Sequence, residues 1–152
     1  PLASGSVTLR AVQTRFFKAF ARVHTPLMAR TRGWPSHIGN NKRFLVLVTR
    51  GLRSGQARKV VLLYMPDPGG YVVIASNFGG ERPPAWWANL RAGPGAEVHV
   101  SGKARAVRAR LLEGPEREAV VARAVRYNAQ WRRYFSVVER ELPVVLLEPA
   151  PG

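Results

Sequence analysis

The sequence predicts an α+β domain in which five or six short strands curl into a small barrel or sandwich beside two or three helices. Short runs of β-branched residues alternate with turns that contain glycine or proline, and only a few segments show helical spacing of apolar residues. The chain of 152 residues, 46% of them hydrophobic, suits one compact core. We therefore expect one domain over residues 1–152, with an N-terminal helix and loop at 1–40 and the barrel at 43–149.

Turn chemistry separates the expected strands. A basic turn with two glycines, residues 51–55, follows the first strand. Residues 66–70, with the sequence PDPGG, form a hairpin turn before the third strand. Ser101-Gly102 is a second hairpin signal. The expected strands are residues 44–49, 60–65, 71–76, 97–100, 103–112 and 143–147.

Three segments have helical character. Residues 7–30 repeat apolar side chains at three- and four-residue steps with basic residues between them, which predicts an amphipathic helix that either covers the core or rests on anionic lipid. Residues 85–92 follow two prolines at the place where a helix can begin. Residues 116–126 carry acidic residues early and arginines late, as the helix dipole favours.

The charge balance predicts an anionic partner. Lysine and arginine number 24 against 9 acidic residues, for a net charge of +15, and most of the cations are arginine. Arginine suits phosphate and carboxylate, so nucleic acid, an anionic membrane face and an acidic small molecule all fit. We expect a cytoplasmic protein, or one peripheral at the inner membrane face, because no apolar run is long enough to span a bilayer.

The sequence lacks the residues that several kinds of catalytic and metal-binding site require. The chain has no cysteine, and its three histidines are dispersed without clustered carboxylates, so we expect no metal site. No catalytic triad or phosphate-loop motif is present. What remains is the basic turn within residues 49–58, where glycines let backbone amides approach an anion and arginines and a serine complete its contacts. A solvated basic hairpin explains the same residues.

Further motifs follow this turn in a specific order. They are ASNFGG at 75–80, PAWWANL at 84–90 and LPVVLLEP at 142–149. Together with LVTRGLRSG at the first turn, their order and spacing closely resemble the deazaflavin-dependent nitroreductase family over residues 44–149. The resemblance implies a split β-barrel of the FMN-binding-like type, with antiparallel strands and flanking helices. It also implies an F420H2-dependent oxidoreductase that transfers a hydride from reduced coenzyme F420 to a nitroaromatic, a quinone or an enone.

The resemblance assigns coenzyme contacts to three segments. The basic turn would hold the phosphate and acidic tail, residues 75–80 would lie along the deazaflavin ring, and the helix after them would add polar and aromatic contacts. Leu52 stands where the family often has arginine, and Asn77 replaces the usual lysine. The implied coenzyme-binding residues are Arg53, Ser54, Gly55, Arg58, Ala75, Ser76, Asn77, Gly79, Gly80, Trp87 and Asn89.

The substrate pocket implied by the resemblance consists of Trp86, Asn128, Trp131 and Tyr134. Ser76 and Tyr134 are the catalytic candidates, for hydrogen bonding or proton delivery to the acceptor. Tyr134 would need nearby arginines to lower its pKa before it could act as an acid. Alternatively, Trp131 and Tyr134 pack the last helix onto the barrel.

Other readings stay open. FMN could replace F420 in a related split-barrel oxidoreductase. A basic barrel with exposed tryptophans could stack nucleic-acid bases, although this leaves the ordered motifs unexplained. A non-catalytic lipid carrier is a third option. Our preferred hypothesis names a small-molecule hydride acceptor, no nucleic acid and no metal, and leaves open a homodimer and contact with an anionic membrane through the N-terminal helix.

Overall fold

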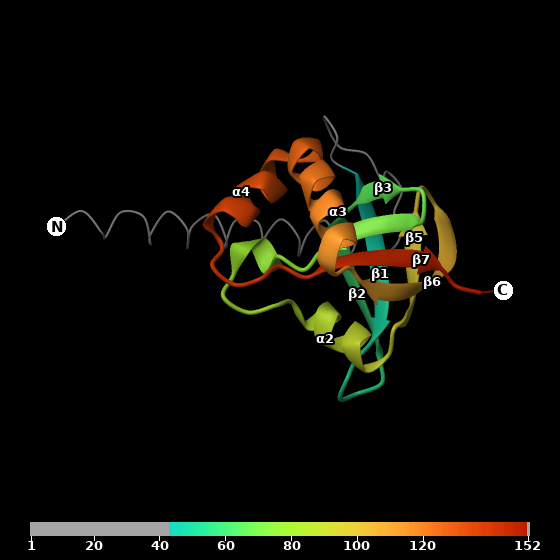
Figure 1. The fold of residues 1–152 in the computed structure, drawn as a ribbon. Coiled ribbons are helices and arrows are strands. Elements are labelled where there is room, and N and C mark those ends of the chain that lie inside the picture. Colours follow the sequence, from blue (N-terminus) through green and yellow to red (C-terminus); the bar gives the residue numbers. More distant parts are fainter. Residues whose placement is uncertain (1–42, 152) are drawn as a thin grey trace.

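A computed structural model describes residues 43–151, so the expected N-terminal helix and its membrane contact lie outside the described residues. The described chain forms one seven-stranded antiparallel sheet and three α-helices, with a short 3₁₀ turn (Figure 1). The elements are β1 (Phe44–Arg50), β2 (Ala57–Leu63), β3 (Met65–Asp67), β4 (Gly70–Ile74), η1 (Asn77–Gly79), α2 (Ala85–Ala92), β5 (Gly95–Val100), β6 (Lys103–Leu111), α3 (Gly114–Tyr127), α4 (Ala129–Val137) and β7 (Val144–Pro149).

The strand order explains why the sheet is curled. Neighbouring strands follow the order β2-β1-β5-β6-β7-β4-β3, so β2 and β3 occupy its two ends. Only Tyr64 separates these two strands along the chain. The sheet must therefore bend round until its ends are brought together by this single residue. This arrangement confirms the α+β class and the curled antiparallel sheet.

Strands β4 and β7 are buried on both faces. Val144, Val145, Leu146 and Leu147 of β7 all have at most 4% of their surface exposed. Because side chains alternate along a strand, Val145 and Leu147 join the core inside the curl, whereas Val144 and Leu146 join a second core on the outer face. This double burial accounts for the unbroken apolar run, which has none of the polar alternation of a half-exposed strand.

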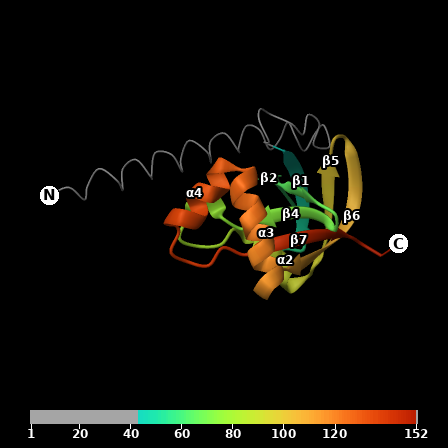
Figure 2. The same cartoon turned by 45° about the horizontal axis from the view of Figure 1, so that its top comes forward.

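The helices divide between the two cores. Helix α2 contributes Trp86, Trp87 and Leu90 to the inner core, whereas α3 and α4 contribute Val120, Ala124 and Trp131 to the outer core. Figures 1 and 2 show α3 and α4 together, and Figure 1 shows α2 apart from them beside the end of β1. Helix α2 has the predicted bounds, and Pro84 occupies its N-cap in an extended conformation.

Differences from the sequence prediction lie mainly at element ends. The second expected strand is split at Tyr64 into β2 and β3, and β3 extends into the segment predicted as a turn. Ser101 and Gly102 both have positive φ, as expected for the predicted hairpin. The aromatic stretch after α3 forms a separate helix, α4, because Asn128 is extended and its side chain caps the new helix.

Candidate functional site

The basic turn between β1 and β2 is held by its own hydrogen bonds. The Gly51 amide donates to the Gln56 carbonyl at 2.7 Å, and the Gly55 amide donates to the Gly51 carbonyl at 2.9 Å. The Arg58 guanidinium donates to Ser54 Oγ at 3.3 Å. Gly55 has a φ of +68°, which favours glycine. A Cβ on Gly51 would lie 2.8 Å from Ser54 Oγ, so a side chain at position 51 would displace the serine hydroxyl.

Asn89 joins this turn to α2. Its Oδ1 accepts from the Leu52 amide at 3.0 Å, and its Nδ2 donates to Thr49 Oγ1 at 3.0 Å. Thr49 is buried, at 3% exposed. Both polar ends of the Asn89 amide are therefore bonded within the protein, and the side chain positions the turn.

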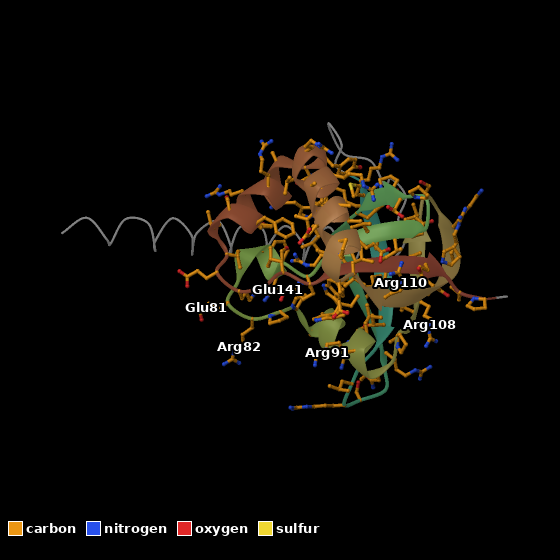
Figure 3. The ribbon with its side chains drawn as sticks, in the orientation of Figure 1. Glu81, Arg82, Arg91, Arg108, Arg110 and Glu141 are labelled. Atoms are coloured by element: carbon orange, nitrogen blue, oxygen red, sulfur yellow. The ribbon has the colours of Figure 1, made fainter. Side chains whose placement is uncertain are left out.

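The turn has a local excess of positive charge. Arg50, Arg53, Arg58 and Lys59 are exposed, and no ion pair within residues 43–151 involves any of them. Arg50 Nη1 donates to the Gly55 carbonyl at 3.2 Å. Elsewhere, acids neutralise arginines, as where Arg110 binds Glu116 and Glu148. Figure 3 shows Arg110 on the side of the molecule away from the loop that carries Glu81 and Arg82.

Residues 75–80 form a strained loop between β4 and α2. Asn77, Phe78 and Gly79 have successive φ values of +46°, +55° and +76°. The left-handed region is uncommon for residues other than glycine and costs about 1–3 kcal/mol each time it is imposed. Asn77 Nδ2 donates to the Arg82 carbonyl at 2.9 Å and thereby helps to hold the loop. Strain of this kind is typical of functional sites, where the surrounding structure maintains it.

Tyr134 reaches this loop from α4. A Cβ on Gly79 would lie 3.3 Å from Tyr134 Cδ1, so the aromatic ring packs directly against the glycine. The Tyr134 hydroxyl accepts a hydrogen bond from Gln130 Nε2 at 2.7 Å. Burial raises the pKa of Tyr134 and outweighs the opposing effects of Gln130 and Arg133. The condition under which Tyr134 could act as an acid, a pKa lowered by nearby arginines, is therefore not met, and the residue is suited to donate a hydrogen bond in its neutral form.

The remaining aromatic candidates lie in the cores. Trp86 and Trp87 are 6% and 8% exposed and pack edge to face in the inner core, whereas Trp131 is 3% exposed in the outer core. Asn128 Oδ1 accepts from the Gln130 and Trp131 amides, at 2.9 and 3.1 Å. In this structure the three tryptophans therefore form no exposed base-stacking surface, and the Asn128 side chain caps α4.

The structure thus links three of the expected parts of the site. The basic turn is bonded to α2 through Asn89, the strained loop leads directly into α2, and Tyr134 packs on Gly79 of that loop. Sequence reasoning did not select Gln130, which bonds to Tyr134, or Arg140, whose guanidinium binds carbonyls of the loop. The spacing of four residues between Gln130 and Tyr134 on a helix could have indicated Gln130. No local sequence pattern indicates Arg140.

Comparison with solved structures defines the class of the fold. A structure of an F420-H2 dependent reductase (FDR-A) is 32% identical and covers 69% of this chain and 93% of its own, with a TM-score of 0.63. A second structure, of a domain-swapped dimer, is 30% identical and covers 78% of this chain and 87% of its own, with a TM-score of 0.66. The fold is that of the split-barrel F420-dependent reductases, as the motifs predicted.

Sequence comparison identifies the family. The family model of the F420H(2)-dependent quinone reductases matches residues 20–149. An F420H(2)-dependent quinone reductase of Mycobacterium tuberculosis strain ATCC 25618 / H37Rv is 32% identical over 130 residues, which cover 83% of this chain and 87% of that protein. This chain belongs to the F420H(2)-dependent quinone reductase family. The family assignment confirms the expected oxidoreductase class and favours coenzyme F420 over FMN.

Proposed function

We propose that this protein binds reduced coenzyme F420 through the basic turn and directs its hydride to a quinone, with nitroaromatics and enones as further acceptors. The observation that carries the proposal is the cationic turn with no carboxylate partner among the described residues, tied by Asn89 to the helix that follows the strained loop. The family assignment supplies the coenzyme class that this turn would serve.

The residues of the turn fit an anionic coenzyme tail. Coenzyme F420 carries a phosphate and glutamate carboxylates, and the turn offers exposed guanidinium groups whose charge is not neutralised by nearby acids. Arg53 and Arg58 would bind the anionic groups, while Gly55 supplies the positive φ that the turn needs between them. The Asn89 bonds hold this binding turn in place before the coenzyme arrives, which lowers the entropy lost on binding.

The residues near Gly79 fit a role toward the acceptor. When bound, reduced F420 supplies a hydride, so no protein nucleophile is needed. The Tyr134 hydroxyl accepts from Gln130, which leaves its own proton to donate to a quinone carbonyl oxygen as negative charge develops there. Ser76 is buried and its hydroxyl does not cap the following turn, so it is the second candidate for such a bond. Trp86 and Trp87 are buried in the inner core together with Ala75, the first residue of the loop, and help to exclude water on that side.

A binding titration with two matched variants tests the proposal. Each charge-assisted contact contributes about 1.5–3 kcal/mol, so R53A/R58A should raise the Kd for F420 at least about tenfold with the fold intact. The control K103A/R105A removes the same charge from exposed positions on β6 and should leave the Kd within about twofold. Fluorescence titration gives the Kd, and oxidation of F420H2 with menadione, a nitroaromatic and an unsaturated lactone gives the acceptor preference.

Two results would contradict the proposal. An unchanged Kd in R53A/R58A would remove the turn from the binding site, and failure of the wild-type protein to bind F420 would remove the function.

The assembly state is a separate proposal. Because a related chain forms a domain-swapped dimer, we propose a homodimer, which light scattering would test. No helix among the described residues is long and apolar enough to cross a membrane. Cytoplasmic location and membrane contact stay predictions.

A further inference from the structure

Arg140 binds the backbone of the strained loop from the segment between α4 and β7. Its Nε donates to the Gly80 carbonyl at 3.0 Å. Its Nη2 donates to the Ser76 carbonyl at 3.0 Å and to the Ala75 carbonyl at 3.2 Å. One guanidinium therefore joins the beginning and the end of residues 75–80.

Few hydrogen bonds between backbone groups of the loop itself hold its conformation, and the Asn77 side chain adds one to the Arg82 carbonyl. Gly79 donates to the Ser76 carbonyl and Gly80 to the Asn77 carbonyl, both at 2.9 Å, which closes only a single 3₁₀ turn. Asn77 and Phe78 are held at positive φ, where residues with a side chain are disfavoured. The Arg140 guanidinium stabilises this conformation, because it can bond to these carbonyls at the same time only while the loop is folded in this way.

The surroundings of Arg140 indicate that geometry, rather than charge pairing, explains its position. No ion pair within residues 43–151 includes Arg140, and the adjacent Glu141 pairs with Arg117 at 3.5 Å. Burial lowers the pKa of Arg140, so placing the cation here has a desolvation cost. The planar guanidinium offers five donors in a fixed fork, which can serve several carbonyls at once, whereas the lysine ammonium is a compact point charge.

Tyr134 confines the same loop at another point, where its ring packs against Gly79. We propose that Arg140 is a positioning residue that holds residues 75–80 in the conformation that receives the deazaflavin ring and presents Ser76 to the acceptor. This inference rests on the proposed function, in which the ring lies along this loop. Arg140 acts through the loop backbone and needs no contact with the coenzyme.

Hydrogen exchange on the coenzyme-free protein tests the positioning role directly. In R140K, the amides of Gly79 and Gly80 should exchange at least about tenfold faster than in the wild type, while amides in β1 and β5 keep their rates. The control R117K alters a nearby arginine that donates to the Leu142 carbonyl at 2.9 Å and pairs with Glu141; no hydrogen bond within the described residues links it to residues 75–80. This control should leave the exchange of Gly79 and Gly80 unchanged.

Coenzyme binding and turnover supply the second measurement. R140K should weaken F420 binding and lower kcat/KM by about 10- to 100-fold, because misplacement by about 1 Å is costly in rate. Guanidinium ion added to R140A should restore part of the binding and rate, and methylammonium should not. R117K should retain wild-type values for both.

The outcomes separate this inference from the proposed function. If the wild-type protein binds F420 but R140K shows unchanged loop exchange or unchanged kcat/KM, the role of Arg140 is overturned while the proposed function stands. Global unfolding of both R140K and R140A, seen by circular dichroism, would also overturn it, since Arg140 would then support the whole domain. Absence of F420 binding in the wild type would overturn the proposed function, whereas the exchange result on the coenzyme-free protein would still report whether Arg140 holds the loop.

Discussion

The side-chain amide of Asn89 has an acceptor bonded to the Leu52 amide and a donor bonded to Thr49 Oγ1, so it holds the basic turn against α2. The motif resemblance implied a direct polar contact with the coenzyme. That contact stays a prediction. The observed bonds show that Asn89 joins α2 to the end of β1 and to the basic turn, so the position of the arginines depends on it. A residue within a binding motif can thus serve binding by fixing its neighbours.

We predict that Asn89→Ala loosens the turn. It removes two hydrogen bonds, one of them to the buried Thr49, and should lower the free energy of unfolding by about 1–2 kcal/mol. The Kd for F420 should rise as well, because the turn loses its attachment to α2. Urea unfolding and fluorescence titration measure the two effects. Gln56→Ala, at an exposed position of the same turn, is the control, and equal behaviour of the two variants would refute the attachment.

Gly79 offers a second test at the residue scale. Its φ is +76° and Tyr134 lies 3.3 Å from its Cβ position, whereas Gly102 has a φ of +78° with nothing within 4 Å. Gly79→Ala and Gly102→Ala therefore incur a similar backbone cost of about 1 kcal/mol, and only the first also displaces the Tyr134 ring. We expect Gly79→Ala to be the more destabilising in thermal unfolding and to lower turnover. A larger loss in Gly102→Ala would contradict the packing of Tyr134 on the loop.

At the scale of elements, Asn128 decides where the aromatic segment becomes a helix. It ends α3 in an extended conformation and its side chain accepts the Gln130 and Trp131 amides at the start of α4. The new helix direction turns Trp131 into the outer core and brings Tyr134 onto Gly79. The separation of α3 from α4 is therefore what delivers a residue of the candidate site.

We predict that Asn128→Ala weakens α4 by removing its N-cap. The loss should be about 1 kcal/mol, whereas Asn128→Ser, which retains a capping oxygen, should recover most of it. Thermal unfolding monitored by circular dichroism compares the variants. Stability in Asn128→Ala equal to that of the wild type would show that the cap is dispensable. The affinity for F420 should change little, because the amide is bonded within the helix.

At the scale of the whole molecule, an ion pair fastens the β3–β4 hairpin to α3. Arg123 binds Asp67, whose side chain is 13% exposed. Burial alone raises the pKa of Asp67, but hydrogen bonds from Arg123 and the Gly69 amide outweigh it and hold the pKa below its ordinary value of 3.8. A carboxyl group with a lowered pKa in the folded state stabilises the fold above its ordinary pKa and loses that contribution in acid.

We therefore predict that the free energy of unfolding decreases as the pH falls from about 5 toward the lowered pKa of Asp67. Asp67→Asn should be less stable than the wild type at neutral pH by about 1 kcal/mol and should show a weaker dependence on acid. Urea unfolding over this pH range measures both. The exposed Glu81, replaced by glutamine, is the control. A parallel pH dependence in Asp67→Asn and the wild type would show that other groups govern acid unfolding.

Local patterns were sufficient for most of the architecture. Runs of β-branched residues predicted six strands, the double proline predicted the start of α2, and Ser101-Gly102 predicted a hairpin. Each of these features depends mainly on neighbours along the chain and on turn chemistry. The split at Tyr64 was missed because the apolar run continues through it, and only the closing of the sheet requires the bend there.

The ordered motifs in the sequence by themselves determined the curled antiparallel sheet, the family and the coenzyme class. The order and spacing of motifs can be read along the chain without knowing which residues are in contact. Only the tertiary structure decided how individual polar side chains are used. Asn89 bonds to a residue 37 positions away, and Arg140 bonds to one 65 positions away. Such partners meet only when the sheet curls and the helices pack on it, so no local pattern reveals which amide or guanidinium is bonded within the fold and which is open to a ligand.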